Sequence, residues 1–153
     1  MKTTITRGDA ARIYGWLNSI ILTKFTKETR KFVISSLRSL KAIATQLGED
    51  EQEAQKKLFA GHEDALEKRS ALVAEFNSTN NLKKRTEIAE KINLFVELQP
   101  LDKELAEMVE AMHKESVEVE LMDMNEENFI EECADAEIGL SGRTLDMLAP
   151  LFK

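Results

Sequence analysis

The sequence predicts a mostly α-helical protein, a long helical hairpin or bundle with a small two-stranded β element. Three observations favour this fold class. Only two prolines and six glycines interrupt 153 residues, which suits long helices. Apolar residues recur at heptad spacing over much of the chain, whereas strict polar–apolar alternation is confined to one short segment. At this length we expect one domain that spans residues 1–153.

The strongest helical pattern lies between residues 26 and 60. Its apolar residues step by four and three, the spacing of a heptad seam, and they are Val33, Leu37, Leu40, Ala44 and Leu47. Thr26 suits the N-cap, and Gly61 suits the position after the last turn. We therefore predict one long helix with a buried seam, and Gly48 is the point at which it can break.

Shorter helices are expected on both sides of this one. Asp9 is the expected N-cap of a first helix that runs to Ile20. The other helices are expected near residues 62–76, 82–99, 101–112, 125–133 and 145–152. In the helix near residues 82–99, Phe95 and Val96 are expected to face inward, and Pro100 is expected to mark its end.

The period changes at Ser116, where polar and apolar residues alternate as far as Leu121. Such alternation predicts a half-buried strand at about residues 116–122. A strand needs a partner for its backbone groups, and the β-branched residues 2–6 are the best candidate. This pairing would bring Lys2 near Glu118 or Glu120.

Cysteine content and hydropathy bear on location. The single cysteine, Cys133, cannot form an internal disulfide, which argues against an oxidised secreted scaffold. The first ten residues lack the apolar segment of a signal peptide, and the apolar stretch at residues 20–22 is too short to span a bilayer. We expect a cytoplasmic protein without membrane contact.

Charge is distributed unevenly along the chain. The net charge is −7, but residues 1–47 carry +7 and residues 101–153 carry −11. Such asymmetry indicates either an external polyanion at the basic part or an internal fit between the basic start and the acidic end.

The basic residues of the long helix and the turn before it fall on one face. At 100° per residue they occupy an arc of roughly 240° to 360°, beside the apolar face. This basic stripe consists of Lys24, Lys27, Arg30, Lys31, Arg38 and Lys41. A cationic stripe can follow a phosphate backbone, which makes nucleic-acid binding one alternative. We favour the other, a solvated face or one paired with the acidic end, because the protein is acidic overall.

The order of features resembles that of a family of short phage and prophage proteins of unknown function. The similarity rests on a brief strand and small helix, the basic entry Lys24–Phe32 into long helices, the acidic strand Val117–Leu121 and the Leu-rich end Leu145–Phe152. The resemblance implies a small protein from a mobile element without enzymatic activity. It supplies no catalytic or binding residues.

One enzymatic alternative is an all-α, Mg²⁺-dependent nucleotide pyrophosphohydrolase, which holds its metal with carboxylates on neighbouring helices. Two pairs at i, i+3 have this spacing, Glu104 with Glu107 and Glu132 with Asp135. On a helical wheel, however, these carboxylates face away from the apolar arcs. His62 and His113 lack neighbours at zinc spacing, and Cys133 lies on an apolar face. We predict no catalytic residue, metal or cofactor.

The remaining prediction is a non-enzymatic protein–protein interaction or assembly protein. The partner is another protein or a second copy, because a long seam can be shared between chains of a homo-oligomer. Met122 and Met124 are mostly expected as core residues, although they can also flank a groove.

Overall fold

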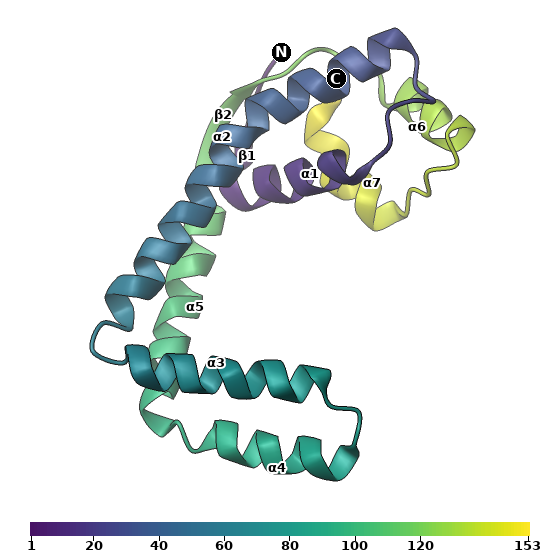
Figure 1. The fold of residues 1–153 in the computed structure, drawn as a ribbon. Coiled ribbons are helices and arrows are strands. Elements are labelled where there is room, and N and C mark those ends of the chain that lie inside the picture. Colours follow the sequence, from purple (N-terminus) through teal and green to yellow (C-terminus); the bar gives the residue numbers. More distant parts are fainter. The chain divides into compact units, whose positions relative to one another are not determined.

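A computed structural model describes residues 1–153. It contains seven α-helices and one two-stranded sheet, which confirms the mostly α fold with a small β element (Figure 1). The contacts divide the chain into two compact units. Unit 1 comprises Met1–Asp50 and Ala111–Lys153, and unit 2 comprises Glu51–Glu110. No helix is both long and apolar enough to cross a bilayer.

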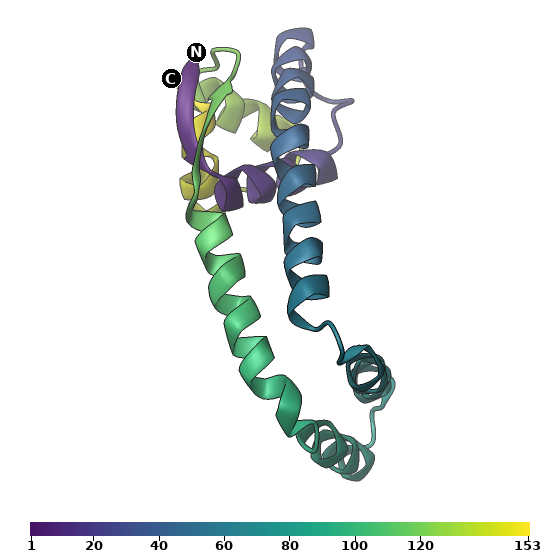
Figure 2. The same cartoon turned by 90° about the vertical axis from the view of Figure 1, so that its left-hand side faces the viewer.

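The sheet joins the start of the chain to a segment more than a hundred residues later. Strands β1 (Lys2–Thr6) and β2 (Ser116–Glu120) pair antiparallel, and Lys2 lies opposite Glu120. The backbone N–H of Leu121 donates to the Met1 carbonyl at 2.8 Å, which extends the pairing by one residue. The predicted strand and its predicted partner are both confirmed (Figure 2).

Helix α1 (Arg7–Ser19) follows β1 without a loop. Its N-cap is Thr6, whose hydroxyl accepts a hydrogen bond from the Asp9 N–H at 3.1 Å. The prediction that Asp9 is the cap is therefore wrong, because the strand leads directly into the helix and places Asp9 inside the first turn. Gly8 is required at this junction, since an added Cβ would lie 2.8 Å from the His113 side chain.

Helix α2 runs from Lys27 to Leu58 without a break at Gly48. The hydroxyl of Thr26 accepts from the Thr29 N–H at 3.4 Å, so the predicted N-cap is confirmed. Gly61 adopts a positive φ of 85° just beyond the helix, as expected for a residue that ends one. The predicted long helix is confirmed.

The heptad seam of α2 faces the interior. Val33 and Leu40 are fully buried and Leu47 nearly so, whereas Leu37 and Ala44 are half-buried. The seam is covered within the chain and does not offer the shared apolar strip that motivated self-association.

The core of unit 1 is centred on an aromatic side chain of α6 (Glu126–Asp135). Phe129 is fully buried, and its ring centroid lies 5.3 Å to 6.4 Å from those of four other aromatic residues. These are Trp16, Phe25, Phe32 and Phe152. Leu148 of α7 (Gly142–Leu148) and Leu151 of the short 3₁₀ helix after it complete this core.

The two chain ends meet at Asp123, just beyond β2. The Met1 ammonium lies 3.7 Å and the Lys153 Nζ 3.0 Å from its carboxylate oxygens. Figure 2 shows the N- and C-termini side by side. The basic start and the acidic end therefore meet here, and they also meet where Arg7 pairs with Glu115 and Lys24 with Glu137.

Unit 2 has a much smaller core. Its helices are α3 (Glu63–Ser78), α4 (Leu82–Asn93), the end of α2 and most of α5 (Gln99–Lys114), and neither α3 nor α5 contains a buried residue. The buried apolar residues of the unit are Ala54, Phe59, Ile88 and Leu98. Polar contacts add to this packing: the Arg69 guanidinium donates to both Asp102 oxygens, at 2.5 Å and 2.8 Å.

The connection between α4 and α5 differs from the prediction. Val96 is 61% exposed instead of buried, and the fully buried residue is Leu98. Helix α4 ends at Asn93, and a 3₁₀ turn at Val96–Leu98 changes the phase of the side chains before α5 begins. Pro100 does not end a helix but lies in the first turn of α5, where its missing N–H costs little.

A buried arginine, Arg7, connects the start of α1 to Asp50 of α2, the residue at which unit 1 passes into unit 2. Arg7 is only 10% exposed at its side chain, and its guanidinium donates to Asp50 at 2.6 Å and to Glu115 at 3.1 Å. The hydrogen bond from Arg7, helped by one from Gln46, lowers the pKa of Asp50 below its usual 3.8.

This pair should make the stability of the protein pH-dependent. The folded protein keeps Asp50 charged at pH values where the unfolded chain protonates it, so the stabilisation is present above pH 3.8 and is lost as the pH falls through the lowered pKa. We expect Asp50→Asn to lower the urea midpoint at neutral pH, and the difference from wild type to shrink well below pH 3.8. Glu49→Gln, an exposed neighbour without an ion pair, is the control and should show neither effect. A difference that stays constant with pH would contradict the assignment.

Candidate interaction surface

The basic stripe lies on the outer face of α2 and the turn before it. All six of its residues are exposed, as the helical wheel predicts. Their orientation is fixed from the opposite side, because Val33 and Leu40 are buried in the core of unit 1 and hold that face of the helix inward. The packing of α2 thus determines that the stripe lies on the outside of unit 1.

Four cations of the stripe surround an open hollow of about 510 Å³. They are Lys27, Arg30, Lys31 and Arg38. The other lining residues are Ile34 and Ser35 of α2 and Met122, which follows β2 in the chain. Ile34 and Met122 are each 41% exposed, so the hollow presents two apolar side chains within a ring of positive charge. We call this site the basic hollow.

Ion pairing within the chain leaves most of the stripe uncompensated. Lys24 lies 3.6 Å from Glu137, and both side chains are well exposed. The other five cations have no carboxylate within 4.0 Å. The alternative in which the stripe pairs with the acidic end of its own chain therefore holds for Lys24 alone.

Helical periodicity identified the cations of this site but not its apolar part. Ile34 falls at 280° on the same wheel, inside the cationic arc, which was a usable signal. Met122 lines the hollow, in agreement with the idea that it can flank a groove. Met124, its proposed companion, instead packs half-buried against the core.

The carboxylate pairs have other surroundings. Glu132 was expected to point away from the protein, but its carboxylate accepts a hydrogen bond from the Thr26 N–H at 2.7 Å and another from the Thr29 hydroxyl. It thereby caps the start of α2 from a different helix. Glu104, Glu107 and Asp135 are exposed, and no three His, Cys, Asp or Glu side chains are grouped so that they could hold a metal ion.

Cys133 belongs to the core and not to a site. It is fully buried beside the aromatic cluster, and desolvation, together with the nearby Glu132 charge, raises the pKa of its thiol to about 11. At neutral pH the thiol therefore stays protonated and is a poor nucleophile.

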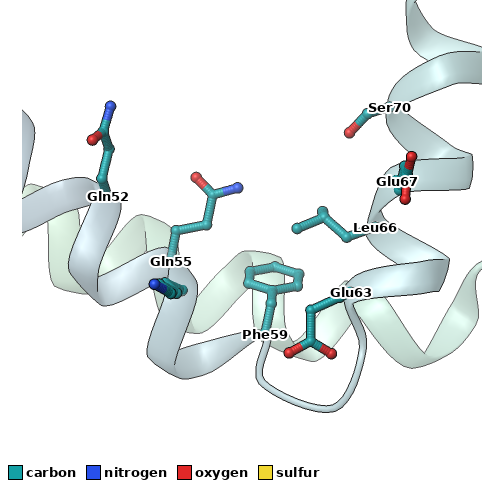
Figure 3. Close-up of a pocket in the computed structure, with 8 residues that line it drawn as sticks. Gln52, Gln55, Phe59, Glu63, Leu66, Glu67 and Ser70 are labelled. Carbon is teal, nitrogen blue, oxygen red and sulfur yellow. The ribbon is translucent and has the colours of Figure 1, made fainter.

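A second hollow of about 460 Å³ lies in unit 2, in the angle between the end of α2 and the start of α3 (Figure 3). Phe59 and Leu66 form its apolar part, and the amides of Gln52 and Gln55 lie at its edge (Figure 3). Lys56, Glu63 and Glu67 also line it, so its charges are mixed.

A third hollow, of about 610 Å³, lies between α1 and α7 and includes Trp16 and Met147. Two arginines and two aspartates line it, so its charges are mixed. Arg12 and Asp9 form an ion pair with each other. Of these three hollows, the basic hollow is the one that combines a single sign of charge with exposed apolar side chains.

Comparisons with protein-family models, with curated proteins and with solved structures found no match to this chain.

Proposed function

We propose that this chain is a non-enzymatic protein-interaction protein with a role in assembly, and that it binds its partner through the basic face of α2. The basic hollow is the observation that carries the proposal, since four unpaired cations there surround the exposed Ile34 and Met122. The resemblance to short phage and prophage proteins adds a phage-type assembly as the context we propose.

The mixture of charge and apolar surface favours a protein partner. Arg and Met are enriched in protein interfaces, and burial of exposed apolar area contributes roughly 25 cal/mol per Å². A phosphate backbone would use the cations but would leave Ile34 and Met122 without apolar contacts. The hollow also lacks an aromatic side chain on which a base could stack.

Nucleic-acid binding is the second candidate. It is supported by one observation, namely that Lys27, Lys31, Arg38 and Lys41 form no ion pair and follow one side of α2. Against it stands the net charge of −7, whose field opposes the approach of a polyanion.

Fluorescence anisotropy with two labelled probes distinguishes these candidates. One probe is a helical peptide with glutamates flanking a row of leucines, and the other is a short DNA duplex. We expect the peptide to bind and the duplex to bind poorly. Lys31→Glu with Arg38→Glu should abolish peptide binding, whereas Lys83→Glu with Lys84→Glu, an equal charge change at exposed positions of α4, should not.

Ile34→Ser supplies the sharper test, because it removes apolar surface without changing charge. Peptide binding should weaken, while any binding of DNA should be unaffected. The opposite result would favour nucleic acid. The duplex would then bind at submicromolar concentration, its affinity would fall with salt at a logarithmic slope of about −5, as about six phosphate contacts would give, and Ile34→Ser would leave it unchanged.

A further inference from the structure

Helix α6 presents an acidic outer face that matches the basic hollow. Its inner side is fixed by the buried Phe129 and Cys133. The residues on the opposite side are exposed, and they are Glu127, Glu131, Ala134 and Asp135. None of the three carboxylates has a basic group within 4.0 Å. This acidic face is thus as uncompensated as the basic hollow.

The two faces also agree in spacing and length. On α2, Lys27, Lys31 and Ile34 step by four and three, and on α6 the steps from Glu127 through Glu131 to Ala134 are the same. At about 1.5 Å per residue, the acidic face is about 12 Å long and the stripe from Lys27 to Arg38 about 16 Å. The small Ala134 would allow close approach to the exposed Ile34 and Met122.

We propose that the partner of the basic hollow is a second copy of this chain, bound through the acidic outer face of its α6. This assignment rests on the proposed function and names the partner. Both faces lie in unit 1, so each copy carries both. Within one copy, α6 meets the start of α2 through Glu132 and the core through Phe129, which leaves its outer face open to a neighbour.

The contact joins two different patches and is therefore heterologous. Each added copy leaves one basic hollow and one acidic face free, so association continues until a ring closes or an open chain grows. Exposed ion pairs are individually weak and are screened by salt. Association should therefore depend on protein concentration and decrease as salt is raised.

A charge-swap experiment by sedimentation velocity tests this. The basic-reversed variant is Lys31→Glu with Arg38→Glu, and the acidic-reversed variant is Glu131→Lys with Asp135→Lys. Each variant alone should lose association by roughly tenfold or more, because like charges then face each other. An equimolar mixture should recover it, since every hollow again finds an α6 face of opposite charge. Lys83→Glu with Lys84→Glu should behave as wild type.

The outcomes separate the partner from the function. A mixture that does not recover association, or a wild type that stays monomeric at every concentration, overturns the assignment of a second copy. If the acidic peptide still binds the monomer, the proposed function stands and only the partner is wrong; if neither binds, both fail. If the basic-reversed variant fails to fold, the neutral double variant Lys31→Gln with Arg38→Gln takes its place in the test.

Discussion

Replacement of Phe129 by alanine should destabilise unit 1 by about 3–5 kcal/mol, one of the largest losses expected from a single substitution in this chain. The ring is fully buried and contacts aromatic residues from α1, α2 and the C-terminal end. Its removal leaves a cavity where these elements meet, and it also removes ring–ring contacts worth about 0.5–1.5 kcal/mol each.

Urea unfolding followed by the fluorescence of Trp16 measures this loss, because the only tryptophan of the chain lies 6.4 Å from the Phe129 ring and belongs to unit 1. Phe129→Leu is the matched control. It fills part of the space without the ring contacts and should cost less than alanine. A loss below about 1 kcal/mol for Phe129→Ala, which is the size typical of an average substitution, would show that this core is not centred on α6.

The regular elements of unit 1 were predictable because their patterns are local. The heptad seam of α2 buries one side of a helix over several turns, and no residue within it breaks the backbone. The alternation at Ser116–Leu121 predicts a strand that needs a partner, and residues 2–6, of which four are β-branched, were the best candidate. In both cases the period alone determined which side chains face inward.

Contacts between distant segments were not predictable in this way. Glu132 lies away from the apolar arc of its own helix, so a wheel places it in solvent. Its carboxylate nevertheless accepts a hydrogen bond from Thr26, 106 residues earlier, at the start of α2. The helix predicted to continue past Asn93 gives way there to a 3₁₀ turn, so Val96 is exposed although helical periodicity predicts it to face inward. Both errors come from treating a helix as isolated and ideal.

The division into two units has no signature in composition. No Pro/Gly-rich linker occurs at residues 50 or 111, because the chain passes from one unit to the other within the continuous helices α2 and α5. The candidate site shows the same limit. Exposure of the stripe follows from the wheel, but the uncompensated charges and the contribution of Met122 depend on tertiary structure.

Leu40→Ala should cost about 2–5 kcal/mol, the range observed for fully buried leucines whose surroundings relax only in part. Leu40 lies at the middle of the seam and is fully buried, so its loss removes apolar contacts and leaves a cavity between α2 and the rest of the unit 1 core.

Leu82→Ala is the matched control for Leu40→Ala, since it makes the same chemical change in a helix at a side chain that is 79% exposed. It should change the free energy of unfolding by less than about 0.5 kcal/mol, as surface substitutions usually do. Both variants can be compared with wild type by urea denaturation followed by far-ultraviolet circular dichroism. The comparison separates burial from helix propensity, because both substitutions replace leucine with alanine within a helix. Equal losses of unfolding free energy at the two positions would mean that the seam is not buried in solution. The outward orientation of the basic stripe depends on that burial and would then be lost as well.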